Sequence, residues 1–464
     1  MSREPTQVEL ERIERQIEER ADAEQRYLRA LRSASRDPAA TPTDPPRITS
    51  RRRFLSGAVA AVAAGSTAAV SRRANAKVPA GAVERPVPAD PTKAQGTPIG
   101  ADGGYGSRSQ FETEVRWRYP TVTAESSWSM TPLEGSLGIV TPSGLHFERH
   151  HNGIATIDPA RHTLIVHGMV DRPKKFSMAD LHRFPSISRM LFLECSGNTL
   201  TEWKKPTLKT VQGTHGLTST SEWTGVPLAL ILREVGVQPG AKWILAEGAD
   251  AAVMTRSIPI EKCWDDALLA YGQNGEAIRP EQGYPLRLLL PGWEGNVNIK
   301  WLRRLQVSDV PFETREETSK YSDLLADGRA RQFTFVMEAK SVITYPSGEM
   351  TLPGPGFHEI TGLAWSARGK ITRTEVSTDG GKTWADARLQ DPVLPICHTR
   401  FRFPWRWDGR PAILQSRATD ETGYVQPTIG ALVGVRGVNS VYHMNGIQSW
   451  AVAENGSVTN VHHF

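Results

Sequence analysis

A short apolar run that ends at a cysteine is the sequence feature that most constrains the fold of this chain. Residues 190–193 have the length and composition of a buried strand, and Glu194 and Cys195 follow directly. The next three residues, Ser-Gly-Asn, are typical of a turn, which places the thiol at the end of the strand. A thiolate there is suited to be a soft metal ligand or a nucleophile. A buried structural cysteine remains the alternative, because cysteine is among the most buried residue types.

The chain around this run has a mixed pattern of strands and helices. From residue 108 the composition becomes globular, and residues 146–308 are predicted to form one unit of strands and helices. Ser177 is a plausible N-cap for the first of two helices. The helices are expected over 177–182 and 228–235, and the strands over 164–168, 243–246, 285–290 and 300–307.

Residues 309–335 are predicted to form a polar connector, and residues 336–464 have the pattern of an all-β domain. Residues 375–378 and 382–384 flank the turn Asp379-Gly380-Gly381, which predicts a hairpin. Further strands are expected over 360–365, 399–403 and 412–418. Short strands at this spacing predict an immunoglobulin-like sandwich, which taken alone is also typical of a binding or adhesion module.

The first 76 residues have the pattern of a leader. Arg51-Arg52-Arg53 precedes a weakly apolar stretch over 57–70, and Ala74-Asn75-Ala76 fits a cleavage site. The pattern predicts export to the periplasm by the twin-arginine pathway, whose substrates commonly fold and load a cofactor first. The apolar stretch is too short to span a bilayer core of ~30 Å, which favours a cleaved signal over a membrane anchor. Residues 77–107, rich in Pro, Gly and Ala, are predicted to form an extended arm.

The charge of the chain points to no polyanionic partner. Its formal net charge is +5, but residues 1–76 hold 14 arginines against 10 acidic residues, which leaves 41 basic and 40 acidic residues beyond them. We therefore expect neither nucleic-acid binding nor attraction to an anionic membrane. Three cysteines are too few for a disulfide scaffold, although a bridge between Cys263 and Cys397 remains open.

The strand followed by Cys195-Ser196-Gly197-Asn198 resembles the molybdenum-ligand segment of the sulfite oxidase family. The resemblance recurs at separated places after about residue 108. It implies an α+β molybdopterin-binding catalytic domain over 108–308, followed by an immunoglobulin-like dimerisation domain over 336–464. It also implies that Cys195 is the protein ligand of molybdenum, beside the two sulfurs of a pterin. A soft thiolate suits a metal that cycles between oxidation states.

Four further segments resemble the pterin-binding pattern of that family. The first, Phe-Glu-Arg-His-His, resembles Phe-x-Arg-Asn-His, with His150 in place of the usual Asn. A surface loop or a zinc pair remains the alternative for His150-His151, although adjacent histidines point different ways and make a poor ligand pair. Gln282 stands where the vertebrate enzymes have His. The cofactor-binding residues that the resemblance implies are Phe147, Glu148, Arg149, His150, His151, Asp250, Arg287, Asn298, Ile299 and Lys300.

The resemblance further implies that Arg149, Tyr321 and Arg436 act in catalysis beside Cys195. A tyrosine that only packs remains the alternative for Tyr321. Thr199 and Leu200 stand where the vertebrate enzymes have two arginines. A site that clamps a small free dianion requires several guanidiniums, so this departure favours sulfur presented on a carrier protein.

These observations imply a periplasmic molybdenum-molybdopterin enzyme that oxidises carrier-bound sulfane sulfur. The sequence holds no Cys-x-x-Cys-His, so we expect no haem in this chain and a separate c-type cytochrome as electron acceptor. The resemblance also implies a homodimer formed through the C-terminal domain. Two alternatives remain: a sulfite dehydrogenase that acts on free sulfite, and a non-catalytic periplasmic binding protein.

Overall fold

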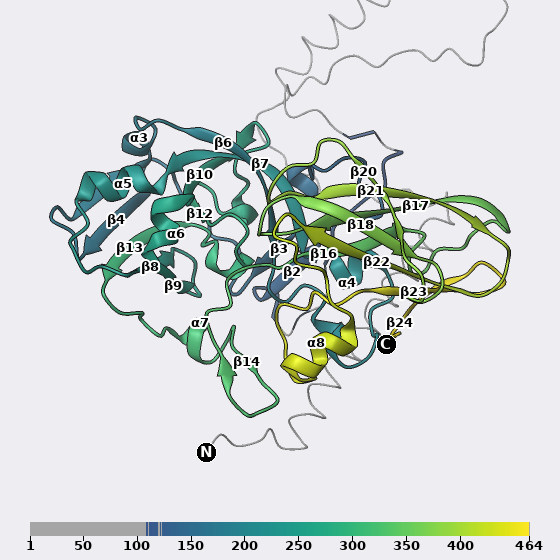
Figure 1. Cartoon of the computed structure of the whole chain (residues 1–464). Coiled ribbons are helices and arrows are strands. Elements are labelled where there is room, and N and C mark those ends of the chain that lie inside the picture. The colour runs from purple at the N-terminus through teal and green to yellow at the C-terminus, as the bar shows by residue number, and fades with distance from the viewer. Residues whose placement is uncertain (1–107, 110, 119–120, 122, 464) are drawn as a thin grey trace, which may run out of the picture. The chain divides into compact units, whose positions relative to one another are not determined.

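The computed structural model describes residues 108–109, 111–118, 121 and 123–463. The predicted leader over 1–76, its twin-arginine signal and the arm over 77–107 lie outside the described residues. The described part consists mostly of strands, with few helices, and its two β-rich regions are joined by residues 309–335 (Figure 1).

The first region is built on two five-stranded sheets. In one, the strand order is β5-β4-β13-β8-β9, and only β4 and β13 run parallel. Its strands are β4 (Thr163–Gly168), β5 (Lys174–Ser177), β8 (Trp243–Gly248), β9 (Thr255–Pro259) and β13 (Leu302–Ser308). The strands expected over 164–168 and 243–246 are confirmed, and the one expected over 300–307 begins two residues later.

The second sheet carries the cysteine. It follows the path β11-β10-β7-β6, and β12 pairs with β10 on the edge opposite β7. Its strands are β6 (Ile187–Glu194), β7 (Thr218–Pro227), β10 (Leu268–Gln273), β11 (Glu276–Ala277) and β12 (Arg287–Leu289). The apolar run over 190–193 therefore lies within β6, as predicted. The strand expected over 285–290 shrinks to β12, because Pro285 has no N–H to donate to a ladder.

Both predicted helices are present, and each follows from local chemistry. Helix α3 (Met178–Leu181) begins with a capping box, in which Ser177 accepts from the backbone N–H of Asp180 and Asp180 accepts from that of Ser177. Helix α5 (Leu228–Val235) has four buried residues at helical spacing and ends at Gly236, whose φ is 70°. Together they cover the core that lies between the two sheets.

Shorter elements frame the space beyond β6. A three-stranded sheet carries the 147–151 segment and consists of β1 (Trp117–Arg118), β2 (Ser127–Met130) and β3 (Glu148–His150). The short helices are α4 (Val211–His215), α6 (Ile260–Asp265) and α7 (Arg315–Thr318). The 3-10 turns are η2 (Ser143–Leu145), η3 (Leu200–Trp203), η4 (Pro280–Gln282) and η5 (Gly295–Val297). A small hairpin in the joining segment pairs β14 (Asp323–Leu324) with β15 (Ala330–Arg331).

The C-terminal region is the expected sandwich of two antiparallel sheets. One sheet has the order β16-β17-β21-β20 and the other β19-β18-β22-β23-β24. Trp365, Phe401, Leu414 and Trp450 are fully buried in the core of this region. Helix α8 (Ile429–Arg436) interrupts the strand series. The strands are β16 (Lys340–Tyr345), β17 (Gly356–Trp365), β18 (Ile371–Ser377), β19 (Ala385–Asp386), β20 (Arg388–Gln390), β21 (Thr399–Trp407), β22 (Ala412–Asp420), β23 (Ser449–Val452) and β24 (Val458–Val461).

One strand prediction in this region is wrong. The hairpin after β18 exists, but residues 382–384 form a loop and the returning strand is β19. Asp379 explains the shift, because its carboxylate accepts from the N–H of Thr383 at 2.9 Å and from its hydroxyl at 2.6 Å. These bonds close the loop before the ladder can resume.

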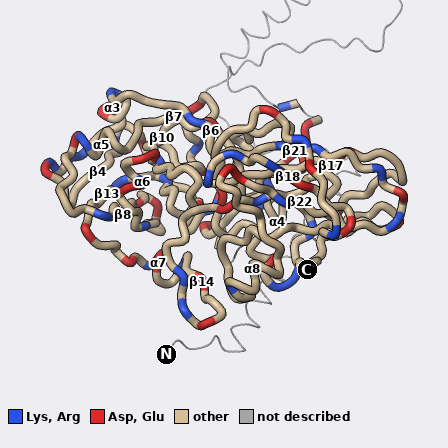
Figure 2. The backbone as a smooth tube through the Cα atoms, in the orientation of Figure 1, with Lys and Arg blue, Asp and Glu red and all other residues tan. Residues whose placement is uncertain are grey.

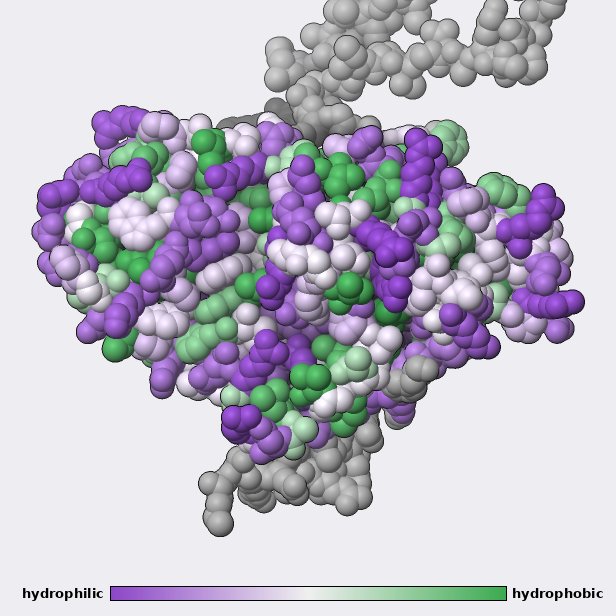
Figure 3. Space-filling view, in the orientation of Figure 1, coloured by the Kyte–Doolittle hydropathy of each residue, from purple (hydrophilic) through white to green (hydrophobic). Residues whose placement is uncertain are grey.

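The surface of the described part carries charges of both signs. Lysine and arginine positions are interspersed with acidic positions along its backbone (Figure 2), which fits the near balance of charge beyond residue 76. Hydrophobic residues are scattered, with a group at the α8 end (Figure 3), where Val435 and Val438 are exposed. Among the described residues, no helix is both long and apolar enough to cross a membrane.

Candidate active site

Cys195 lies where two cavities meet. The first cavity and the second cavity share Cys195, Arg149 and Tyr321 in their linings. The N–H of Cys195 donates to the carbonyl of Leu217 at 2.9 Å, so the thiol stands one residue beyond β6, as predicted. A Cβ at Gly197 would lie 3.3 Å from Leu200 Cδ2 and 3.9 Å from the Cys195 sulfur. Glycine at this position therefore leaves the thiol uncovered.

The Cys195 thiol lies at the edge of a hydrophobic cluster and also lines both cavities. Burial raises the pKa of the Cys195 thiol, and the nearby charge of Arg149 opposes that shift. A bound soft metal would hold this group as thiolate against its burial. Cys263 and Cys397 are buried, free, and absent from both cavity linings. The bridge that the sequence left open is not formed; instead, the Cys397 thiol donates to the carbonyl of Met190 at 2.9 Å.

The first cavity brings together all the predicted cofactor-binding residues. They come from β3 and the turn after it, the turn after β8, the start of β12 and the segment after η5. The cavity is lined by Phe147, Glu148, Arg149, His150, His151, Asp250, Arg287, Asn298, Ile299 and Lys300.

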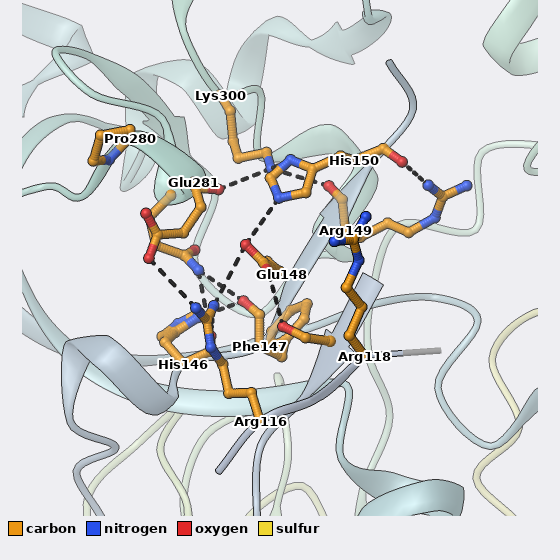
Figure 4. A network of polar contacts seen from close by, with 12 residues as sticks. Arg116, Arg118, His146, Phe147, Glu148, Arg149, His150, Pro280, Glu281 and Lys300 are labelled. Atoms are coloured by element: carbon orange, nitrogen blue, oxygen red, sulfur yellow. Dashed lines mark hydrogen bonds and ion pairs between the residues drawn. The ribbon is translucent and has the colours of Figure 1, made fainter. Parts of the chain in front are cut away.

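A polar network organises one wall of the first cavity (Figure 4). Glu148 contacts His150 Nε2 at 3.0 Å and Arg116 at 3.4 Å, and it accepts from the hydroxyl of Ser129 at 2.9 Å. Burial favours a higher pKa for Glu148, but the hydrogen bond to His150 and the charge of Arg116 lower it to about 2. The ammonium of Lys300 lies 2.9 Å from His150 Nδ1. His150 is therefore held on both ring nitrogens.

Two buried cations give the first cavity its positive character. Burial lowers the pKa of Arg287 to about 9, and burial together with the charge of Arg287 lowers that of Lys300 to about 7. Lys300 donates to the carbonyls of Arg149 and Glu281, each at 3.0 Å. Arg287 donates to the carbonyls of Gln282 and Asn298. An anionic ligand would stabilise both cations in their charged form.

The chemistry of the first cavity fits a phosphate-bearing pterin that brings a metal. Arg287 Nε, His146 Nε2 and Asn296 Oδ1 are buried polar atoms with no partner in the protein, and polar ligand atoms would satisfy them. The described residues hold no group of three or more His, Cys, Asp or Glu side chains that could bind a metal together. One thiolate alone suits a metal that arrives on an organic ligand.

Asp250 and Asn298 contribute in different ways. Asp250 Oδ1 accepts from the N–H of Met254 at 3.2 Å, which fixes the turn after β8 at the cavity. The side chain of Asn298 is fully used, since it accepts from the N–H of Leu290 at 2.7 Å and donates to the carbonyls of Trp293 and Glu294. The backbone N–H of Asn298 donates to the carbonyl of Gly295 at 3.2 Å and its carbonyl accepts from Arg287, so Asn298 mainly fixes the segment after η5 at the cavity.

Tyr321 and His151 form a pair at the junction of the two cavities. His151 Nε2 lies 2.7 Å from the Tyr321 hydroxyl, and Tyr321 has a φ of 43°. Burial, followed by the charge of Arg149, lowers the pKa of His151 to about 3, and burial raises that of Tyr321 well above its ordinary value. Both groups are thus neutral at pH 7, and a neutral imidazole beside a phenol can relay a proton. Because His150 and His151 bind different partners, the structure offers no zinc pair.

The second cavity has far fewer charged residues in its described lining than the first, and its volume is about 280 Å³. Leu200, Leu208 and Leu217 form much of its wall, with Trp128, Met130 and Tyr442. Arg149 is the only charged residue in the described lining, and its guanidinium lies 5.6 Å from the centre of the Trp128 ring.

The structure does not bring Arg436 to either cavity. Its guanidinium is buried, donates to the carbonyl of His443 at 3.0 Å and forms an ion pair with Asp323. The other oxygen of Asp323 accepts from the N–H groups of Val441 and Tyr442 at 2.8 and 3.0 Å. Because Asp323 already neutralises it, Arg436 supports the Tyr442 wall of the second cavity instead of facing a substrate there.

Several residues of the first cavity were not predicted from the sequence. Among them, His146 and Asn296 carry the unpartnered atoms described above, and Trp301 also lines the cavity. His146 directly precedes the 147–151 segment, so extending that motif by one residue would have included it. Nothing local marks Asn296; its amide donates to the Ser196 hydroxyl at 3.0 Å through a contact 100 residues away in the chain.

Glu202, buried beneath the wall of the second cavity, predicts a pH effect on stability. Burial raises the pKa of Glu202 from 4.5 to about 7, against the hydrogen bonds from Asn460 and Thr201. The folded state therefore binds this proton more tightly than the unfolded state, so the free energy of unfolding falls as the pH rises from 4.5 to 7. The loss is on the order of 3 kcal/mol. We expect Glu202→Gln to remove this fall, as measured by thermal midpoints at pH 5 and pH 8; parallel pH dependence in both proteins would contradict the assignment.

Comparison with known proteins agrees with the fold and the site. Residues 151–316 match the family described as "Oxidoreductase molybdopterin binding domain", and residues 331–450 match the "Mo-co oxidoreductase dimerisation domain". The chain belongs to the sulfite oxidase family of molybdopterin-binding oxidoreductases.

Within this family, a solved structure with high similarity is that of the sulfane dehydrogenase SoxCD from Paracoccus pantotrophus. The identity is 48%, the TM-score is 0.77, and the match covers 79% of this chain and 95% of that one. Nitrate reductases [NADH] of Cichorium intybus and Solanum lycopersicum are 34% and 32% identical over 303 and 331 residues, which is 58% and 62% of this chain. The chain spans only 32% and 36% of their length.

Proposed function

We propose that this protein is a molybdenum-dependent sulfur dehydrogenase that oxidises sulfane sulfur held on a carrier protein. The second cavity carries this proposal, because it is largely apolar, ends at Cys195 and holds a single arginine among its described lining residues. A tethered sulfur needs less positive charge and is suited to such a cavity, whereas a small free dianion would require more guanidiniums. The likeness to a sulfane dehydrogenase supports the same substrate class.

The residues of the first cavity would hold the pterin. Arg287 and Lys300 provide positive charge for its phosphate, and Asp250 provides an acceptor. Cys195 would be the protein ligand of molybdenum. When bound, the centre supplies two-electron oxidation of sulfur with oxygen drawn from water.

The residues at the junction would act on the substrate. Arg149 lines both cavities beside Cys195, and its guanidinium would stabilise the negative charge that develops on oxygen as sulfur is oxidised. Tyr321 would donate its O–H to that oxygen, and the neutral imidazole of His151 would hold the Tyr321 hydroxyl in place by donating its Nε2–H to the phenol oxygen. The leucines of the second cavity exclude bulk water, which strengthens both interactions.

The electrons would leave to a separate c-type cytochrome, and the match to a dimerisation domain supports a homodimer formed through residues 336–464.

A sulfite dehydrogenase is the second candidate, favoured by Arg149 at the junction. A non-catalytic binding protein is the third candidate, and a cofactor measurement distinguishes it from the two enzymes. Purified folded protein should contain about one molybdenum and one pterin per chain; native protein free of both would overturn the enzymatic proposal.

Export is the part of the proposal that rests on the leader. We expect Arg51→Lys combined with Arg52→Lys to leave the protein in the cytoplasm, because a receptor reads the twin arginines as a motif and not as charge. Cell fractionation followed by immunoblotting measures this. A matched Arg72→Lys/Arg73→Lys variant, which leaves the motif intact, should reach the periplasm. Normal periplasmic accumulation of the first variant would contradict this route.

A further inference from the structure

Glu194, the residue before Cys195, is completely buried and receives its hydrogen bonds mainly from the C-terminal region. Oε1 accepts from Lys340 Nζ and from Asn198 Nδ2, each at 2.9 Å, and Oε2 accepts from Trp365 Nε1 at 2.7 Å. Lys340 and Trp365 are direct cross-strand partners at the ends of β16 and β17. One pair in the sandwich therefore directs both side chains at the carboxylate that precedes the thiol.

Lys340 contacts both ends of the turn that carries Cys195, which runs from Glu194 to Thr199. Its ammonium, which is 2% exposed, also donates to the Thr199 hydroxyl at 2.7 Å. Thr199 has a φ of 70°, which a β-branched residue adopts only when its surroundings hold it there. Lys340 thus fixes the residue before Cys195 and the residue four positions after it.

Further contacts from the same region hold the middle of the turn. The N–H of His443 donates to the carbonyl of Ser196 at 2.8 Å. On the other side, a Cβ at Gly295 would lie 3.3 Å from Cys195 Cα, so η5 packs closely against the backbone of the turn. The turn is therefore clamped between the two regions, and its position depends on their contact.

We propose that Lys340 is a positioning residue for Cys195, and that the sandwich region sets the position of the metal-binding thiol through the Lys340–Glu194 ion pair. This inference rests on the proposed role of Cys195 as the molybdenum ligand. It assigns the C-terminal region a task in positioning the metal ligand that is separate from dimer formation. Changing residues that hold a metal ligand in place typically costs about 10–100-fold in metal affinity or activity.

The test compares Lys340→Met/Glu194→Gln with the wild type. The double change removes both charges, so that no unpaired charge is left buried. Molybdenum, pterin and kcat are measured per folded chain, and the thiolate-to-metal absorption band is recorded. Because the pterin brings the metal, we expect both to remain, kcat per molybdenum to fall by about tenfold, and the band to shift. Arg373→Met, which breaks an exposed ion pair in the same region, should change neither kcat nor the band.

A folded double variant with wild-type kcat per molybdenum and an unchanged absorption band would overturn the inference. If the double variant does not fold, Trp365→Phe replaces it, because this change removes one hydrogen bond to Glu194 and keeps an aromatic ring. It should give smaller changes in the same direction, and an unchanged band with wild-type kcat would again overturn the inference. Wild-type protein without molybdenum would overturn the proposed function as well, so the two failures are distinguishable.

Discussion

Replacing Cys195 with serine is expected to abolish turnover while the fold and the pterin remain. The hydroxyl is a harder and poorer ligand than a thiolate, although it occupies nearly the same space. Cys195 is the only described cysteine that lines either cavity, so no other described thiol could take its place. We expect kcat to fall by roughly a hundredfold or more, because even residues that only support a metal ligand cost about 10–100-fold. The measurement is steady-state turnover normalised to folded protein.

Cys263→Ala is the matched control, since Cys263 is an equally free thiol buried in the first region and away from both cavities. Its activity and metal content should stay near those of the wild type once the folded fraction is accounted for. Near wild-type turnover and full molybdenum loading in Cys195→Ser would show that another group binds the metal.

Replacing Leu200 with arginine is expected to shift preference toward free sulfite. Leu200 lines the second cavity next to Gly197 and the thiol, where the described lining has only one cation. A well-formed guanidinium contact to an anion contributes ~1.5–3 kcal/mol, which corresponds to about a tenfold to hundredfold change. The measurement is kcat/KM for sulfite and for the carrier-bound substrate in both proteins.

An unpaired charge in an apolar cavity costs stability, so the thermal midpoint of Leu200→Arg must be measured first. Leu200→Met conserves volume and adds no charge, and it should keep the wild-type ratio of the two kcat/KM values. If folded Leu200→Arg also keeps that ratio, position 200 does not set specificity, and the missing arginines no longer support a carrier-bound substrate.

Local signals account for what the sequence predicted well. The apolar run of β6, the Ser177 cap of α3 and the spacing of α5 depend on neighbours within a few residues. The ten cofactor-binding residues were placed by resemblance to family motifs, and the structure brings all of them to one cavity. Their individual roles in binding remain predictions.

Contacts between distant segments account for what the sequence did not reveal. Arg436 belongs to a motif that resembles a substrate arginine, but Asp323, 113 residues earlier, pairs with it. Lys340 is 146 residues from Glu194, and nothing in the sequence around either residue predicts their ion pair. The hairpin after β18 differs from the prediction because the side chain of Asp379 closes a longer loop than its glycines suggest.

The most direct test of the proposed function is reduction of the purified, molybdenum-loaded enzyme by each substrate in a single turnover, followed by stopped-flow absorption. The account predicts that carrier-bound sulfane sulfur reduces the wild-type enzyme at least about tenfold faster than free sulfite at equal concentration, a difference of about 1.4 kcal/mol. Reduction by sulfite at an equal or greater rate would contradict it.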